Sequence, residues 1–235
     1  MGPVLPAART AHCYGETLMA NIGTLPGERL AGLSADLFHK LQRGNITLDE
    51  LALFTQHKNP FTFERNEHGH IVLNVTGLYL DGAQEIERLD AASYRISGDA
   101  KSCLLSVMED GYDAMHRLMN RQYKVVLMPI KDIENENDHT TDNLYKRGTE
   151  KYGYIKPVGG VMPRVREQIS DGQMEDIGIY YIVAFHEPIK NSNGDPYVLC
   201  IDRNDGGRWL DASVNQSGGG HWDDGGCVAF LAPEG

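Results

Sequence analysis

The C-terminal stretch GRWLDASVNQSGGGHWDDGGCVAFLAP, residues 207–233, places Asp, Asn, Ser and His side chains between two tryptophans and a run of apolar residues. Carboxylates, imidazoles and hydroxyls are groups that bind ligands, coordinate metals or transfer protons, and clustered glycines offer backbone N–H groups to an anion. The tryptophans and the run VAFL belong in a packed interior. One segment therefore combines the residues of a binding surface with those of a core.

The sequence lacks the motifs of common catalytic sites. It contains no G-x-S-x-G, no P-loop, no dinucleotide-binding fingerprint after a strand and no H-E-x-x-H. No predicted helix begins after the glycines at 218–220 and 225–226, and no lysine follows them, which argues against a phosphate loop. We therefore expect no catalytic residue and no cofactor.

Two histidine-containing motifs are candidates for metal binding. They are HGH, from His68 to His70, and the pair Asp138-His139 in the polar run ENENDHTTDN. Neither has a carboxylate or cysteine partner at a defined spacing. Solvated loops are the favoured interpretation, and we expect no metal site.

The cysteines give no sign of zinc or redox chemistry, because they are widely spaced and form no C-x-x-C pair. They are Cys13, Cys103, Cys200 and Cys227. Buried or incidental thiols are favoured, and a single disulfide stays an alternative.

Composition and charge limit the partners. The formal net charge is -11 and no basic stripe is present, which argues against nucleic acid or an anionic membrane surface. The first residues, MGPVLPAARTAHCYGE, do not have the pattern of a signal peptide, and no apolar run approaches the length of a membrane span. We expect a soluble chain without membrane insertion.

The residue types between Arg203 and Ala229 form a restricted set. Apart from Trp209, Gln216 and Trp222, each residue there has a codon that ends in C and can arise from the asparagine codon AAC by changes at its adenines. Lys, Glu and Met, which are frequent elsewhere, are missing from this segment. Loops also favour Gly, Asp, Asn and Ser, so the order of the residues carries more information than their composition.

That order is a strand, an Asn-Gly hairpin, a returning strand, an RWL-A element, a second Trp and a closing VAFLAP, over residues 186–233. In this order the chain resembles the variable proteins of diversity-generating retroelements. These are C-type-lectin-fold proteins whose C-terminal repeat is rewritten by adenine-directed mutagenic reverse transcription. The N-terminal stretch ITLDELALFTQHKNPF is similar to an appendage of the same class.

The resemblance implies a non-enzymatic protein that binds an unknown protein or small-molecule ligand through a diversified surface at about residues 203–229. The implied ligand-binding residues are Asp205, Gly206, Gly207, Asp211, Ser213, Val214, Asn215, Gly219, His221, Asp223 and Asp224. We expect their acidic members to favour cationic or hydrogen-bond-donating ligands. Trp209, Trp222 and Phe230 are expected to be buried in the fixed part of the fold.

Three other functions remain open. A calcium-dependent carbohydrate-binding lectin would use Trp222-Asp223-Asp224 with Glu187-Pro188, although six to eight oxygen ligands must then converge. An oxidase related to the formylglycine-generating enzymes would need a cysteine pair, for which Cys200 and Cys227 are the local candidates. The third is a structural or tail-fibre-like module.

The elements that must position these residues divide the chain into a helical N-terminal region, residues 1–64, and a domain of residues 65–235. In the first region, Ser34 is predicted to cap one helix, and Thr47 with Glu50 has the spacing of a capping box at the start of a second. The acidic start of the second helix favours a docking or oligomerising appendage over a DNA-binding helix-turn-helix.

In the domain, strands are predicted at 71–80, at YKVVLMPI, at Ile179–Ile189, at YVLCIDR and in the last apolar run, and helices at 99–120, 161–170 and 170–178. The apolar residues of 99–120 are expected in the core. They are Leu104, Leu105, Met108, Met115, Leu118 and Met119. Strands at both ends with helices between them predict an α+β fold, C-type lectin-like, with an antiparallel sheet.

Overall fold

The computed structural model describes residues 27–43, 45–55, 63–191, 193–204, 207–214 and 221–233. The predicted ligand-binding residues Asp205, Gly206, Asn215 and Gly219 lie outside these ranges. Contacts divide the chain into two units between Thr62 and Phe63, two residues before the predicted domain boundary.

The N-terminal unit contains helices α2 (Gly27–Gln42) and α3 (Leu48–Thr55). Helix α2 begins well before Ser34, so the prediction that Ser34 caps it is wrong. The capping box of α3 is confirmed: the Glu50 amide donates to Thr47 Oγ1 over 3.1 Å, and the Thr47 amide donates to Glu50 Oε2 over 2.6 Å.

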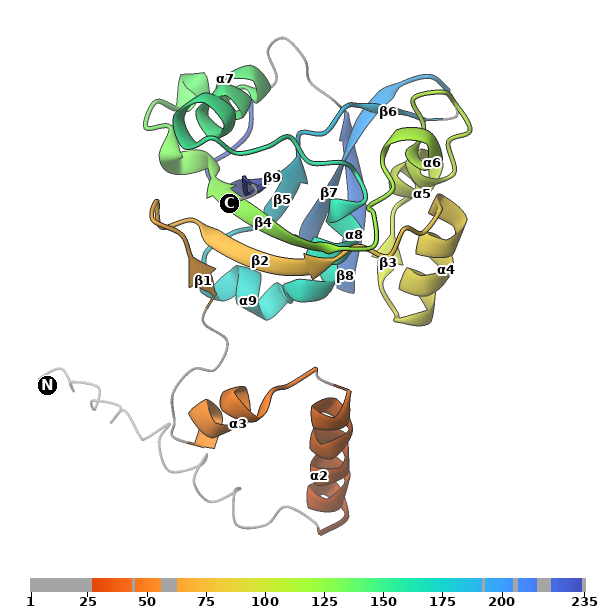
Figure 1. Ribbon diagram of the computed structural model, residues 1–235, viewed down its shortest axis with the longest axis vertical. Helices are drawn as coiled ribbons and strands as arrows, with labels where there is room; N and C mark the ends of the chain where they lie inside the picture. The colour runs from red at the N-terminus through yellow and green to blue at the C-terminus, as the bar shows by residue number, and fades with distance from the viewer. Residues whose placement is uncertain are drawn as a thin grey trace, which may run out of the picture. The chain divides into compact units, whose positions relative to one another are not determined.

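The second unit is built on one sheet, so the protein is a mixed α+β structure (Figure 1). Its strands are β1 (Glu64–Arg65), β2 (Ile71–Thr76), β3 (Arg95–Ile96), β4 (Gln122–Pro129), β5 (Tyr181–Ala184), β6 (Ile189–Lys190), β7 (Pro196–Asn204), β8 (Gly207–Val214) and β9 (Gly226–Leu231). The strand order is β1-β2-β4-β9-β5-β7-β8-β3, with β6 beside β7. The predicted strand Ile179–Ile189 is thus split into β5 and β6.

The prediction of an antiparallel sheet is wrong in two places, because β9 is parallel to β5 and β3 is parallel to β8. The physical reason for the β5–β9 pair is that the last strand lies in the middle of the sheet, between β4 and β5. Strands β4 and β5 run in opposite directions, so β9 is antiparallel to β4 and parallel to β5.

The same topology explains the long glycine-rich segment between β8 and β9. These strands point in one direction, and parallel strands need a connection that returns along the sheet. Val214, the end of β8, pairs with Tyr197 at the start of β7. Gly226, the start of β9, pairs with Tyr181 of β5. Tyr181 in turn pairs with Asp202, near the end of β7. The start of β9 therefore lies at the opposite end of the sheet from the end of β8.

Alternate side chains of the strands enter two separate cores. One contains Leu127, Ile201 and Leu210 with side chains of α8 (Val161–Gln168) and α9 (Asp171–Asp176). Helices α4 (Gly82–Ala91) and α5 (Gly98–Leu104) complete this side.

The other core contains Val183, Val228 and Phe230, and it is covered by α7 (Thr141–Lys146) through Leu144. The chain reaches α7 through the 3-10 turns η2 (Ile130–Asp132) and η3 (Glu136–Asp138), and a π-helical turn, η4 (Arg147–Lys151), follows it. Figure 1 shows α7 and α9 on opposite sides of the strands.

The helical prediction for 99–120 holds only for two short pieces, α5 and α6 (Tyr112–Met115). Leu104 and Leu118 are buried as predicted. The other four apolar residues are exposed, which corrects the prediction that they belong to the core: Leu105, Met108, Met115 and Met119. Because the helix ends at Leu104, the apolar stripe of a continuous helix never forms.

None of the helices in the described ranges has the length and apolarity needed to span a bilayer.

Candidate functional site

A hollow of about 290 Å³ lies on the face of β7 and β8 that is not covered by α8. Its lining residues are Tyr181, Cys200, Asp202, Asp211, Ala212, Ser213, His221, Trp222 and Asp223. We call it the β7–β8 hollow. Strand alternation explains its floor, because Cys200, Asp202 and Asp211 point to this face while Ile201 and Leu210 enter the core on the other side.

The wall of the hollow is the segment 221–225, the described part of the connection between β8 and β9. Its backbone is held by residues outside the segment. The Trp222 amide donates to the His139 carbonyl over 2.9 Å, and the Tyr180 amide donates to the Gly225 carbonyl over 2.7 Å. The Tyr181 hydroxyl also donates to the Asp223 carbonyl over 3.1 Å. The path of this wall is therefore held mainly by contacts with residues outside it.

Trp222 anchors the wall through its ring. The ring packs at 5.9 Å from Tyr181 and 5.4 Å from Phe185, between ring centroids, and its Nε1 donates to Thr141 Oγ1 over 3.0 Å. Full burial was predicted for Trp222 and for Trp209, and this is wrong, since both are half-buried. Trp222 forms one side of an open hollow, and Trp209 lies on the open face of β8. Phe230 is buried as predicted.

Two carboxyl groups meet on the floor. In the antiparallel pairing of β7 and β8, Asp211 lies opposite Cys200, one pleat from Asp202 on the same face. Burial, then the charge of Asp211 and its hydrogen bond to Asp202, raise the pKa of Asp202 to about 6, although Arg166 acts in the opposite direction. Asp202 is therefore protonated below about that pH, beside the carboxyl of Asp211.

The structure brings together four of the predicted ligand-binding residues in this hollow: Asp211, Ser213, His221 and Asp223. Val214 is exposed at the end of β8, and Gly207 forms its first residue. Asp224 is exposed outside the hollow lining, with its Oδ1 3.9 Å from His139 Nδ1.

Sequence reasoning missed Tyr181, Cys200 and Asp202 as lining residues. A signal for Asp202 was present, because it follows Val198 and Cys200 at alternate positions and is the first charged residue of that series. When a carboxylate occupies the next alternate position after apolar residues of a strand, that face of the strand is expected to be exposed at this point.

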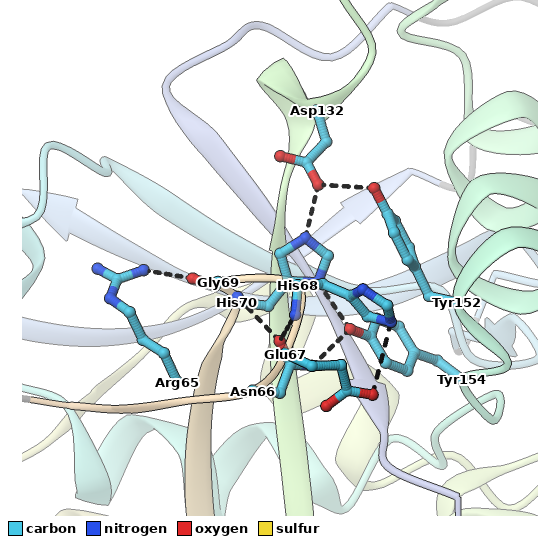
Figure 2. A network of polar contacts seen from close by, with 9 residues as sticks. All are labelled: Arg65, Asn66, Glu67, His68, Gly69, His70, Asp132, Tyr152 and Tyr154. Carbon is cyan, nitrogen blue, oxygen red and sulfur yellow. Dashed lines mark hydrogen bonds and ion pairs between the residues drawn. The ribbon is translucent and has the colours of Figure 1, made fainter.

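The HGH motif belongs to a different polar network, shown in Figure 2. His70 is buried, with its Nε2 2.6 Å from Asp132 Oδ2 and its Nδ1 2.7 Å from the Tyr154 hydroxyl. Tyr152 donates to the same Asp132 oxygen over 3.2 Å, and Asn66 Nδ2 donates to Tyr154 over 2.6 Å. These bonds tie the turn between β1 and β2 to the segments after β4 and η4.

The prediction of solvated loops is therefore wrong for two histidines. His70 is engaged in the network of Figure 2, and His139 is buried with its Nε2 2.7 Å from the Ile133 carbonyl. Two polar residues of the run ENENDHTTDN have structural roles. Thr140 caps α7, and Thr141 Oγ1 accepts a hydrogen bond from Trp222 Nε1. Among the residues that the structure describes, no group of three His, Cys, Asp or Glu side chains is arranged to hold a metal.

The described ranges hold neither a group of three acidic side chains arranged for a metal, as the calcium-dependent lectin needs, nor a contact between Cys200 and Cys227, as the oxidase needs. Glu187 pairs with Lys156 Nζ over 2.6 Å, and Asp223 Oδ1 accepts from the Gly225 amide over 2.9 Å. Cys200 and Cys227 belong to the cores on opposite sides of the sheet, and both are free thiols whose pKa is raised by burial. Cys103 is also a free thiol.

Comparisons of the chain with protein-family models, with curated proteins and with solved structures found no match.

Proposed function

We propose that this chain is a non-enzymatic binding protein, C-type lectin-like in its design, that recognises its target with the exchangeable side chains of the C-terminal surface. The target is a protein or a small molecule. The surface consists of the outer face of β8 and the wall 221–225, and it surrounds the β7–β8 hollow.

One observation supports this proposal above the others. The backbone of the wall is held by main-chain hydrogen bonds and by Trp222, which contacts residues of β5 and α7. Side chains such as Ser213, Val214 and His221 make no hydrogen bond or ion pair with other described residues, and they are half-buried or exposed. Such positions change with little effect on folding, as loops on a rigid scaffold do.

A library experiment tests the proposal. Six described positions are randomised with codons that end in C: Asp211, Ser213, Val214, His221, Asp223 and Asp224. A matched library randomises six supporting positions: His139, Thr141, Val183, Leu210, Trp222 and Phe230. Both libraries are displayed and sorted for resistance to protease, and the survivors of the first are selected against several unrelated proteins.

We expect most members of the first library to fold and few of the second, and we expect binders to more than one target from the first. Equal loss of folded members in both libraries would contradict the proposal. A second check is genomic: a near-copy of the DNA for residues 203–229 that differs at adenines, beside a reverse transcriptase gene, is expected in the flanking sequence.

A further inference from the structure

We propose that the β7–β8 hollow receives a cationic group, a guanidinium or an ammonium, which the carboxyls of Asp202 and Asp211 hold against the rings of Tyr181 and Trp222. This inference rests on the proposed function, since it names the ligand chemistry of the same surface. It goes further in assigning a binding role to Asp202 and Tyr181, which precede the variable segment of residues 203–229.

The first observation in favour of a cationic ligand is the charge of the residues that line the hollow. Three of the nine lining residues are aspartates, and no lysine or arginine is among them. Within the described part of the chain, no salt bridge joins Asp202 or Asp211 to a basic side chain, although the charge of Arg166 acts on Asp202. Two neighbouring carboxyls that no described basic side chain pairs with form a complementary site for a cation.

The second, independent observation in favour of a cationic ligand is the pair of aromatic rings that line the hollow. Tyr181 and Trp222 line the hollow with their rings 5.9 Å apart, between centroids, and Trp222 is fixed by its hydrogen bond to Thr141. Aromatic faces attract cations, and a planar guanidinium also stacks on them. Neutral ligands and anions gain nothing comparable from an acidic floor.

The third observation is the raised pKa of Asp202 beside the cationic site. Below that pKa Asp202 is neutral, and a cation that binds beside it then displaces its proton to the buffer. Binding is therefore weaker at low pH, where Asp202 is protonated. The titratable groups that face the pair are Tyr181 from β5, Cys200 from β7, and His221 and Asp223 from the wall. Arg166 belongs to α8, which covers the other face of the sheet, and acts on Asp202 through its charge. Of the groups that face the pair, His221 also gains positive charge at low pH, so its contribution has to be separated.

The test uses the full chain labelled with ¹⁵N and titrated by NMR with ethylguanidinium chloride. Ethylurea, a neutral molecule of the same shape, and butyrate are the controls. We expect saturable shifts at the backbone of Asp211 and Ser213 and at the indole of Trp222 with ethylguanidinium at pH 7.5. We expect affinity about tenfold lower at pH 5, because only about a tenth of the Asp202 carboxyls are then ionised.

Variants identify the groups responsible. Asp202→Asn and Asp211→Asn are each expected to weaken binding at least about tenfold. Asp202→Asn is expected to abolish the pH dependence, and Asp211→Asn to reduce it, because burial still raises the pKa of Asp202. Asp176→Asn, on an exposed site of α9 and outside the recognition surface, is the matched control and is expected to bind like the parent. His221→Gln is expected to retain the pH dependence. Thermal unfolding of each variant verifies that it is folded.

Two further ligands distinguish the sources of the cation. Tighter binding of acetyl-Gly-Arg-Gly-amide than of ethylguanidinium indicates a side chain of a protein partner, whereas equal or tighter binding of ethylguanidinium or butylammonium indicates a small free cation. Equal affinity for ethylurea and ethylguanidinium, or unchanged affinity in both aspartate variants, would overturn the inference. If either result is found while the first library, randomised at the six surface positions, still yields binders, the proposed function stands and the inference alone fails.

Discussion

At the scale of single residues, the acidic pair Asp202 and Asp211 is the feature with the clearest energetic consequence. The folded state holds a proton on Asp202 more tightly than the unfolded chain does, because burial and like charge raise its pKa from 3.8 to about 6. A raised carboxyl pKa means that the contribution of Asp202 to stability is greatest below pH 3.8 and is lost as the pH rises through about 6. The pair therefore costs stability at neutral pH, which is typical of a site kept for binding.

Asp211→Asn tests this cost. Removal of the negative charge lowers the pKa of Asp202, so we expect the variant to be more stable than the parent by about 1 kcal/mol at pH 7 and to show little difference at pH 4. Thermal unfolding at the two pH values measures the effect. Asp176→Asn, on an exposed site of α9, is the control and should show no comparable gain. A variant that is no more stable than the parent at pH 7 would contradict the assignment.

Asp223 and Asp224 are neighbours with different roles. Asp223 Oδ1 accepts from the Gly225 amide over 2.9 Å, whereas Asp224 is exposed and has only a contact of 3.9 Å with His139. Asp223→Ala is expected to cost about 1 kcal/mol through loss of that hydrogen bond, and Asp224→Ala no more than about 0.5 kcal/mol. Chemical denaturation of both variants compares them. Equal costs would mean that the turn does not need the Asp223 side chain.

At the scale of elements, a buried ion-pair group joins helices α4 and α8. Glu85 contacts both Arg164 and Arg88, and Arg164 Nη1 lies 3.2 Å from Glu167 Oε2. Glu85 and Arg164 are each only 3% exposed. Removing one member of such a pair leaves the other charge buried without compensation.

Glu85→Ala is accordingly expected to destabilise the domain by roughly 3–5 kcal/mol, and Glu85→Gln by less because the amide still accepts a hydrogen bond. The exposed pair of Asp90 and Lys101, 3.8 Å apart, offers the control, and Asp90→Ala should cost no more than about 1 kcal/mol. Unfolding in urea measures all three variants. A cost for Glu85→Ala as small as that for Asp90→Ala would show that α4 does not depend on this ion pair.

At the scale of the whole molecule, the second unit contains its own two cores. Phe63, its first residue, packs partly buried against the larger core, and β1 pairs with β2 directly after it. The unit therefore begins at Phe63, and a boundary at residue 65 divides β1.

A fragment of residues 63–235 is expected to fold alone and to unfold cooperatively. A fragment of residues 66–235, which lacks Phe63 and β1, is expected to be less stable by about 1 kcal/mol or more, because apolar area of the core becomes exposed. Circular dichroism during heating compares the two fragments. Aggregation or absent cooperativity of the longer fragment would contradict its independence.

The sequence alone determined features that depend on neighbours along the chain. The capping box of Thr47 with Glu50 and the cap of Ser170 on α9 involve residues three positions apart. The turn at Asn193-Gly194, where Gly194 has a φ of 89°, is equally local. Alternation of side chains predicted the strand at 71–80, and apolar runs with β-branched and aromatic residues predicted others, since neither signal requires knowledge of the partner strands.

Tertiary structure decided which strands are neighbours and which residues meet across them. Entry of β9 between β4 and β5 made the sheet mixed, and pairing of β7 with β8 placed Asp202 beside Asp211. Burial of His139 beneath the wall of the hollow also depends on contacts between residues about eighty positions apart. Periodicity states which face of a strand is apolar, but pairing follows from the free energy of packing the whole sheet, to which distant segments contribute together.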